Sequence, residues 1–265
     1  MKKTALIILS LVCAFFCIFG VAACGDPNSS SDDQPTALDK AFDEYYKTEN
    51  MTVVVKDERA VKYGNDYSTT SKVDFAHKTA YTHRMFGAGT TGVIDEAYFE
   101  LVGDDNLIIY GVITDTVNGD VSRTKVERRD LFVNYNENGM FSSLEQYQLT
   151  LLNSFVENSL PARNLIDTAF RESSESQSNW ASLEFITGEF KESESGVYTA
   201  NIYFCINNDG VYEPYACAVT IRLDGQGRFK SCELDFGTNG KITAGYTYGT
   251  ANVIIPDDVK NAQYD

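Results

Sequence analysis

Apolar and polar residues alternate along much of this chain, which is the pattern of strands with one buried and one solvated face. Residues 51–55 begin a first β-rich stretch, and a second one includes residues 200–206, 217–223 and 229–236. The Asn118-Gly119 dipeptide lies between two β-rich runs and is a strong hairpin signal. We therefore predict two antiparallel meanders.

Two other segments have helical spacing. Thr36, with Asp39 three residues later, predicts the start of a short amphipathic helix that ends near residue 49. Ser142 and Glu145 predict a second helix start, and Pro161 separates that helix from a short third one. The apolar stripes of these two later helices contain Leu144, Leu151, Leu152 and Phe155, and then Leu165, Ile166 and Phe170.

The predicted order is therefore a helix, a long meander, a helical insertion and a second meander. The helices are too few and too clustered for alternating βαβ units, which argues against a parallel sheet. We predict one α+β domain over residues 36–265. Its core is a single curved antiparallel sheet with a few helices on the concave face.

The N-terminus has the pattern of a targeting segment. Lys2 and Lys3 precede a run, residues 5–23, that contains no charged residue. Val21-Ala22-Ala23-Cys24 at its end resembles the lipobox of bacterial lipoprotein signal peptides. The resemblance implies that residues 1–23 are removed and that Cys24 is diacylated, and two acyl chains are enough for stable anchoring. An ordinary signal peptide and a retained membrane helix are the alternatives.

Residues 24–35 follow as a lipidated cysteine and a polar, flexible tether, which reaches roughly 20 Å on average. The charge asymmetry around the apolar run places the rest of the chain outside the cytoplasm. We therefore expect a cell-membrane protein that is held by its lipid and faces away from the cytoplasm.

The formal net charge of −16 excludes nucleic acid as a partner, because phosphate binding needs a basic surface. Residues 1–23 contain two Lys and no acidic residue, so their removal leaves 20 basic and 38 acidic residues and a net charge of −18. An anionic membrane surface repels such a body, so the lipid would be its only hold on the membrane.

The order of elements resembles the LolA/LppX group of extracytoplasmic lipoproteins and lipoprotein carriers. Residues 73–81 are similar to an early hairpin of that group, and residues 248–259 are similar to its closing strand and Ile-Pro-x-x-Val end. The resemblance implies an open half-barrel that binds a lipid or another hydrophobic ligand between sheet and helices. The seven apolar helix residues named above would then guard the cavity; the alternative is that they are ordinary core.

Residues for catalysis do not assemble into a known pattern. His77 and His83 are the only histidines, and there is no Gly-x-Ser-x-Gly nucleophile motif. The cysteines lack metal-site spacing and no calcium loop is present. We expect no enzymatic activity, metal or cofactor. A saccharide or cell-wall hydrolase is a less favoured reading, since it needs two carboxylates facing one cleft.

Cysteine and tyrosine leave two further questions. Three cysteines follow the N-terminal segment: Cys205, Cys217 and Cys232. Cys217 and Cys232 lie on successive predicted strands, where they are candidates for a disulfide. The alternative is that the cysteines are small buried apolar side chains. The chain has 16 Tyr, several on predicted strands. A tyrosine-rich sheet supports a second hypothesis, a surface module that binds a protein partner as a sensor or assembly factor.

Overall fold

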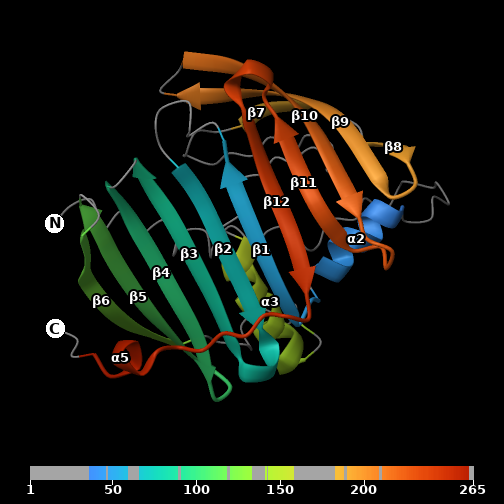
Figure 1. The fold of residues 1–265 in the computed structure, drawn as a ribbon. Helices are drawn as coiled ribbons and strands as arrows, with labels where there is room; N and C mark the ends of the chain where they lie inside the picture. Colours follow the sequence, from blue (N-terminus) through green and yellow to red (C-terminus); the bar gives the residue numbers. More distant parts are fainter. Residues whose placement is uncertain are drawn as a thin grey trace.

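The computed structural model describes residues 36–45, 47–58, 66–88, 91–117, 120–132, 141, 143–157, 183–187, 190–208 and 211–262. Its strands form one 12-stranded antiparallel sheet in the order β6-β5-β4-β3-β2-β1-β12-β11-β10-β9-β7, with β8 beside β9 (Figure 1). The sheet is open and curved, so the predicted single antiparallel sheet is confirmed over the described part of the chain.

The two predicted meanders are the two halves of this sheet, and they meet where the first strand pairs with the last. The strands of the first half are β1 (Asn50–Asp57), β2 (Asp66–Asp74), β3 (Thr79–Ala88), β4 (Thr91–Val102), β5 (Asn106–Val117) and β6 (Asp120–Phe132). Those of the second are β7 (Leu183–Thr187), β8 (Lys191–Glu194), β9 (Val197–Asn208), β10 (Val211–Leu223), β11 (Phe229–Asp235) and β12 (Lys241–Tyr248). Val117 pairs with Asp120, which confirms the predicted two-residue hairpin connection.

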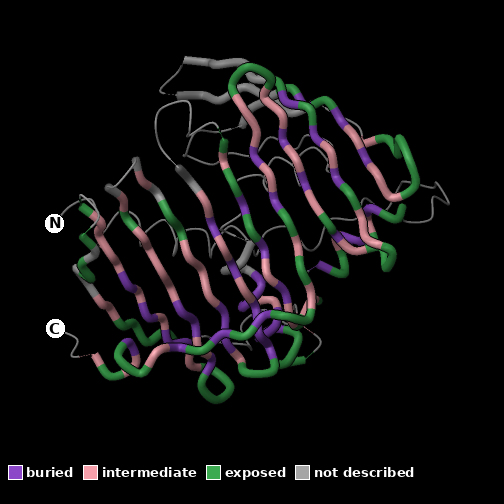
Figure 2. Tube along the Cα trace, viewed as in Figure 1, coloured by how far each residue is buried: buried purple, intermediate pink, exposed green. Residues whose placement is uncertain are grey.

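Burial follows the two-residue period of the strands. In β1, Met51, Val53 and Val55 are buried, whereas Val54 and Lys56 between them are exposed. Figure 2 shows the same alternation of buried and more exposed residues along most strands. One face of the sheet carries the helices α2 (Ala37–Tyr45) and α3 (Leu144–Glu157), and we call it the helix face (Figure 1).

Helix α2 begins with the predicted capping box. The Thr36 N–H donates to Asp39 Oδ2 at 2.7 Å, and the Asp39 N–H donates to Thr36 Oγ1 at 3.1 Å. Its buried face packs Tyr45 against Phe229 and Tyr246, with ring centroids 5.8 and 6.1 Å apart. The helix ends at Tyr45, earlier than predicted, since the chain then turns into β1.

Helix α3 begins one residue later than predicted. The Gln146 N–H donates to Ser143 Oγ at 3.1 Å, so Ser143 is the capping residue and the predicted Ser142–Glu145 pair is displaced by one position. The helix packs against β2 and β3. Its amide side chains fix its position, because Gln148 Nε2 donates to the Gly103 carbonyl and Asn153 Nδ2 donates to the Thr48 carbonyl.

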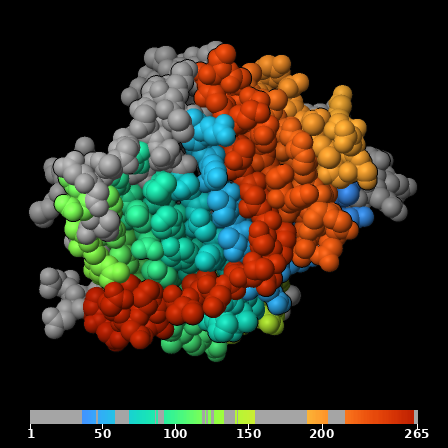
Figure 3. All heavy atoms as spheres, in the orientation of Figure 1, coloured from blue at the N-terminus to red at the C-terminus, as the bar shows by residue number. Residues whose placement is uncertain are grey.

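The other face of the sheet is crossed by the C-terminal segment, residues 249–262, which we call the strap; we call this the strap face. The strap runs from the end of β12 over β1 to β5 and ends in the one-turn helix α5 (Asp257–Lys260) (Figures 1 and 3). It buries a second apolar cluster, separate from the main core, made of Tyr98, Ile108, Tyr110, Val112, Val253, Ile255 and Val259. The segment expected from the resemblance as part of a closing strand is therefore an extended cover, and β12 is the strand that closes the meander.

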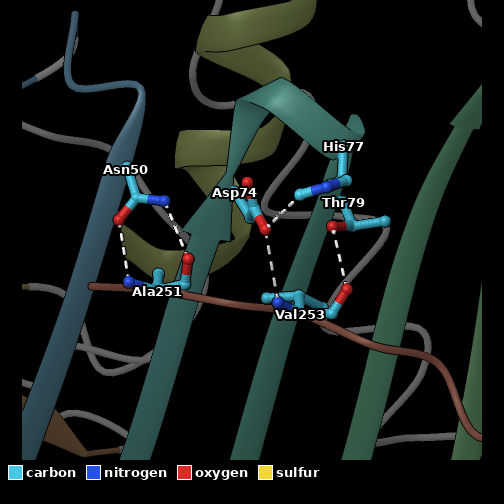
Figure 4. A network of polar contacts seen from close by, with 6 residues as sticks. All are labelled: Asn50, Asp74, His77, Thr79, Ala251 and Val253. Atoms are coloured by element: carbon cyan, nitrogen blue, oxygen red, sulfur yellow. Dashed lines mark hydrogen bonds and ion pairs between the residues drawn. The ribbon is translucent and has the colours of Figure 1, made fainter. Parts of the chain in front are cut away.

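A polar network holds the strap to the sheet (Figure 4). The Asn50 side chain donates to the Ala251 carbonyl and accepts from the Ala251 N–H, both at 2.8 Å. Asp74 Oδ2 accepts from the Val253 N–H, and Thr79 Oγ1 donates to the Val253 carbonyl, each at 3.4 Å. Side chains of the sheet thus take the place of a neighbouring strand for this segment.

The Asn50 amide is the shortest of these links, so Asn50→Ala is expected to lower the free energy of unfolding by about 1–3 kcal/mol. Urea unfolding followed by circular dichroism measures this change. Asn201→Ala is the matched control, because Asn201 is an exposed strand residue on the same face, and it should change stability by less than about 0.5 kcal/mol. Equal effects in the two variants would contradict the role of Asn50.

Candidate functional site

The predicted cavity residues that the structure describes belong to the main core. Leu151 and Leu152 are 5% and 0% exposed, and Leu144 packs against the same cluster. These three residues therefore pack in the main core, which is the alternative that the sequence left open for them. The Phe155 side chain lies outside the described residues, as do Leu165, Ile166, Phe170 and the predicted lipidation site Cys24.

A different set of residues on the helix face forms a band of small side chains. Ser71, Thr82, Ala97 and Gly111 are directly opposite one another on β2, β3, β4 and β5, and we call them the small-residue row. A Cβ atom added at Gly111 would meet one neighbour within 4 Å among the described residues, the Glu127 Cβ at 3.9 Å. The side chains along this row are therefore small, and Ser71 at its β2 end is buried.

Thr69 lies beside this row and is the unusual polar group of the helix face. It is 1% exposed, and its Oγ1 is buried without a hydrogen-bond partner. A buried hydroxyl that lacks a partner costs about 1–3 kcal/mol. A ligand that supplies a hydrogen-bonding group at this position would remove that cost.

The cross-strand neighbours of Thr69 on the next two strands are charged residues. Thr69 pairs with Arg84 on β3, and Arg84 pairs with Asp95 on β4. Burial raises the pKa of the Asp95 carboxyl, with Asp115 acting in the same direction and Arg84 opposing it. The small-residue row is thus bordered by an unpaired hydroxyl and an exposed guanidinium, a combination that suits an elongated apolar chain with a polar head group.

The strap face carries a row of aromatic and basic side chains in register. Tyr81, Tyr98 and Tyr110 are opposite one another on β3, β4 and β5, with Lys72 and Arg128 at the two ends. Lys72 Nζ lies 5.7 Å from the Tyr81 ring centroid, and Arg128 Cζ lies 5.9 Å from that of Tyr110. The cations extend the row by cation–π contacts.

The phenol groups of this row are neutral donors. Tyr81 and Tyr98 donate to Glu96 Oε1 at 2.7 and 3.4 Å. Burial is the main cause that raises the pKa of Tyr98 to about 12, and it raises the pKa of Tyr81 further. These tyrosines support the strap face from within, and the alternation of apolar and polar residues does not predict that they meet.

Most tyrosines on or beside the strands and the first helix contribute to the interior of the protein in the described part of the chain. Tyr45 is buried, and Tyr246 and Tyr248 pack against the main core. Tyr203 is 58% exposed and is the one from that group that extends into solvent among the side chains described. Tyr46 and the side chains of Tyr212 and Tyr215 lie outside the described residues.

The two histidines and the neighbouring carboxylates Asp95 and Glu96 do not gather at one site. Asp95 faces the helix side of β4 and Glu96 the strap side, because successive strand residues alternate. His77 Nδ1 lies 2.7 Å from Asp74 Oδ2, while the His83 ring stacks on Tyr81. Within the described ranges, no group of three or more His, Cys, Asp or Glu residues is arranged to hold a metal ion.

The predicted disulfide candidates are not joined in the structure. Cys232 is opposite Ile221, and Cys217 lies four residues further along β10. That offset is about 13 Å along a strand, whereas the Cα atoms of a disulfide are at most about 7 Å apart. Both thiols are buried, and burial raises the pKa of Cys232 to about 12, so they act as small apolar side chains.

Comparisons with known proteins add no family to this description. No protein-family model matches the chain, and a search of curated proteins found no match. In the part of the chain that the structure describes, no helix has both the length and the apolarity needed to span a membrane.

The unpaired hydroxyl of Thr69 can be tested through stability. Thr69→Val should raise the free energy of unfolding by about 1 kcal/mol, because it removes a buried polar group that has no partner. Thr79→Val is the matched control: Thr79 is also buried, but its hydroxyl donates to the Val253 carbonyl, so this change should destabilise the protein. Denaturant unfolding of both variants decides the matter, and a destabilised Thr69→Val protein would show that the hydroxyl has a partner.

Proposed function

We propose that this chain is a lipid-anchored extracytoplasmic protein, not an enzyme, that binds a ligand with a long apolar chain and a polar head group on the helix face. The observation that carries this proposal is the buried, unpaired Thr69 hydroxyl at the border of the small-residue row. An apolar chain would lie along the small side chains of this row, and its head group would supply the partner that Thr69 lacks.

The architecture supports the same proposal. An open, curved antiparallel sheet with helices on one face is what the resemblance to LolA/LppX-type lipoproteins implies for residues 36–265. In this proposal the helix face is the inside of a half-barrel. The ligand lies across β2 to β5, beside α3, whose own apolar residues are already part of the core.

The anchor is proposed from the sequence of the first 24 residues. Cys24→Ser removes the acceptor thiol, so it should abolish incorporation of a palmitate analogue and shift the protein from the membrane fraction to the soluble or secreted fraction. Metabolic labelling and cell fractionation measure both effects. Cys17→Ser is the matched control, since Cys17 lies within the apolar run and should leave labelling unchanged. Labelling that persists in Cys24→Ser would contradict the proposed anchor.

The binding site is tested by filling the small-residue row. Gly111→Leu places a branched side chain on the helix face of β5, in the path of the proposed ligand, and should weaken binding of fluorophore-labelled palmitate by about tenfold or more. Gly111→Ala should give a smaller loss in the same direction. Fluorescence titration of the purified chain in a detergent of low micelle concentration measures the dissociation constants.

A matched control exists on the opposite face of the sheet. Gly245 is also a strand glycine, but it lies on the strap side of β12, and an added Cβ there would meet no described residue within 4 Å. Gly245→Leu should leave palmitate binding within about twofold of the parent. Equal loss in the two leucine variants, or none in either, would count against a ligand on the helix face.

The second candidate function, a protein-interaction module, draws its support from the strap face. The strap crosses one half of that face, and Tyr203 is exposed on the other half. The hydrolase reading has less support, because Asp95 and Glu96 point to opposite faces of the sheet.

A further inference from the structure

The strap is recognised by a single cross-strand row, which we call the strap site. Asn50, Asp74, Thr79, Glu100 and Ile108 are opposite one another at the ends of β1 to β5. Asn50 binds the backbone of Ala251 with two hydrogen bonds, while Asp74 and Thr79 bind the backbone of Val253 (Figure 4). Recognition of the backbone at every second residue is how proteins bind extended peptides.

Apolar and charged contacts complete the site. Val253 and Ile255 are 6% exposed each, whereas Ile254 between them is 72% exposed, so alternate side chains enter the site. Beyond them, Lys260 Nζ lies 2.7 Å from Glu100 Oε1, and Arg123 pairs with Asp258. The strap site therefore selects a sequence by backbone, by apolar spacing and by charge.

The strap is also separable from the rest of the fold. Its apolar cluster is distinct from the main core. The contacts of Ala251, Val253, Asp258 and Lys260 with the sheet given above all use a side chain on at least one side, and none of them is a rung of a strand ladder. Gly249, where the strap leaves β12, has a φ of +73°, a conformation that suits a hinge glycine.

We propose that the strap site is an interaction surface for a second copy of this chain, in which two molecules exchange residues 250–262. Detachment exposes Tyr98, Ile108 and Tyr110 on one side and Val253 and Ile255 on the other, and both apolar surfaces need a cover. The segment that matches every element of the site is the strap of another copy. Exchange reproduces each contact, and because the partners are identical it closes into a two-fold dimer.

Two complementary variants of the full chain test this exchange. The site-reversed variant carries Glu100→Lys and Arg123→Asp, and the strap-reversed variant carries Asp258→Arg and Lys260→Glu. Each variant alone has both ion pairs mismatched within its own molecule. In an exchanged heterodimer all four pairs are matched, because the reversed strap lies on the reversed site and the native strap on the native site.

The variants are given different affinity tags, co-expressed, purified from membranes in detergent and captured through one tag. Recovery of the second tag should be about tenfold higher than for either variant paired with its own differently tagged copy. The chain with all four substitutions is the matched control. Its charges pair again within one molecule, so its recovery should equal that of the parent chain.

Two outcomes would overturn the proposal. One is equal recovery of the second tag for the mixed pair and for the two like pairs, with all variants folded by circular dichroism. The other is enhanced recovery that persists after residues 250–265 are deleted from both chains, since the contact would then lie elsewhere. If a reversed variant fails to fold, Gly249→Val replaces it: strain at the positive φ should raise the dimer fraction in light scattering severalfold, and a purely monomeric folded variant would refute exchange. This test does not depend on the ligand proposed for the helix face.

Discussion

The pairing of β1 with β12 is the interaction on which the rest of the structure depends. Residues 51–57 are opposite residues 242–248, and this single ladder joins the first and last strands into one sheet. Because side chains alternate, the same register places Met51 in the main core and Asn50 on the strap face. A slip of one residue would exchange the two faces of every strand that follows. The strap leaves β12 beside Asn50, so its anchoring also depends on this ladder.

The ladder gives the two faces different roles. Helices α2 and α3 cover the helix face, and the strap covers part of the opposite face. Strand β5 shows the consequence, since Leu107 is buried towards the helices while Ile108, Tyr110 and Val112 are buried under the strap. A strand buried on both faces reads as a nearly continuous apolar run, which is how residues 107–110 appear in the sequence. The strap is therefore a structural layer of the domain and not a loose tail.

Local rules predicted the parts of the fold that depend on local sequence. The alternation of apolar and polar residues predicted the strands, Asn118-Gly119 predicted a hairpin, and Thr36 with Asp39 predicted the start of α2. Cross-strand neighbours were beyond those rules, because register depends on how every strand aligns with the next. Hence Cys217 and Cys232 were placed on the right strands but four residues out of line. The small-residue row was missed for the same reason, since only the register of four strands places Ser71 and Gly111 at the two ends of one row.

The contact between Asn50 and Ala251 spans 201 positions of sequence, and no pattern in either segment announces it. Its counterpart on the helix face is Thr69, a threonine that would be an unremarked strand residue if its hydroxyl had a partner. The two sites differ in this respect. Every polar group named in the strap site has a partner, so exchange with another molecule replaces each contact by an identical one and changes little in energy. The hydroxyl of Thr69 has none, so a ligand there adds a contact that the protein alone does not make. On these physical grounds the strap face is suited to binding the strap of a second copy of this chain, and the helix face is suited to binding a different molecule, the proposed ligand.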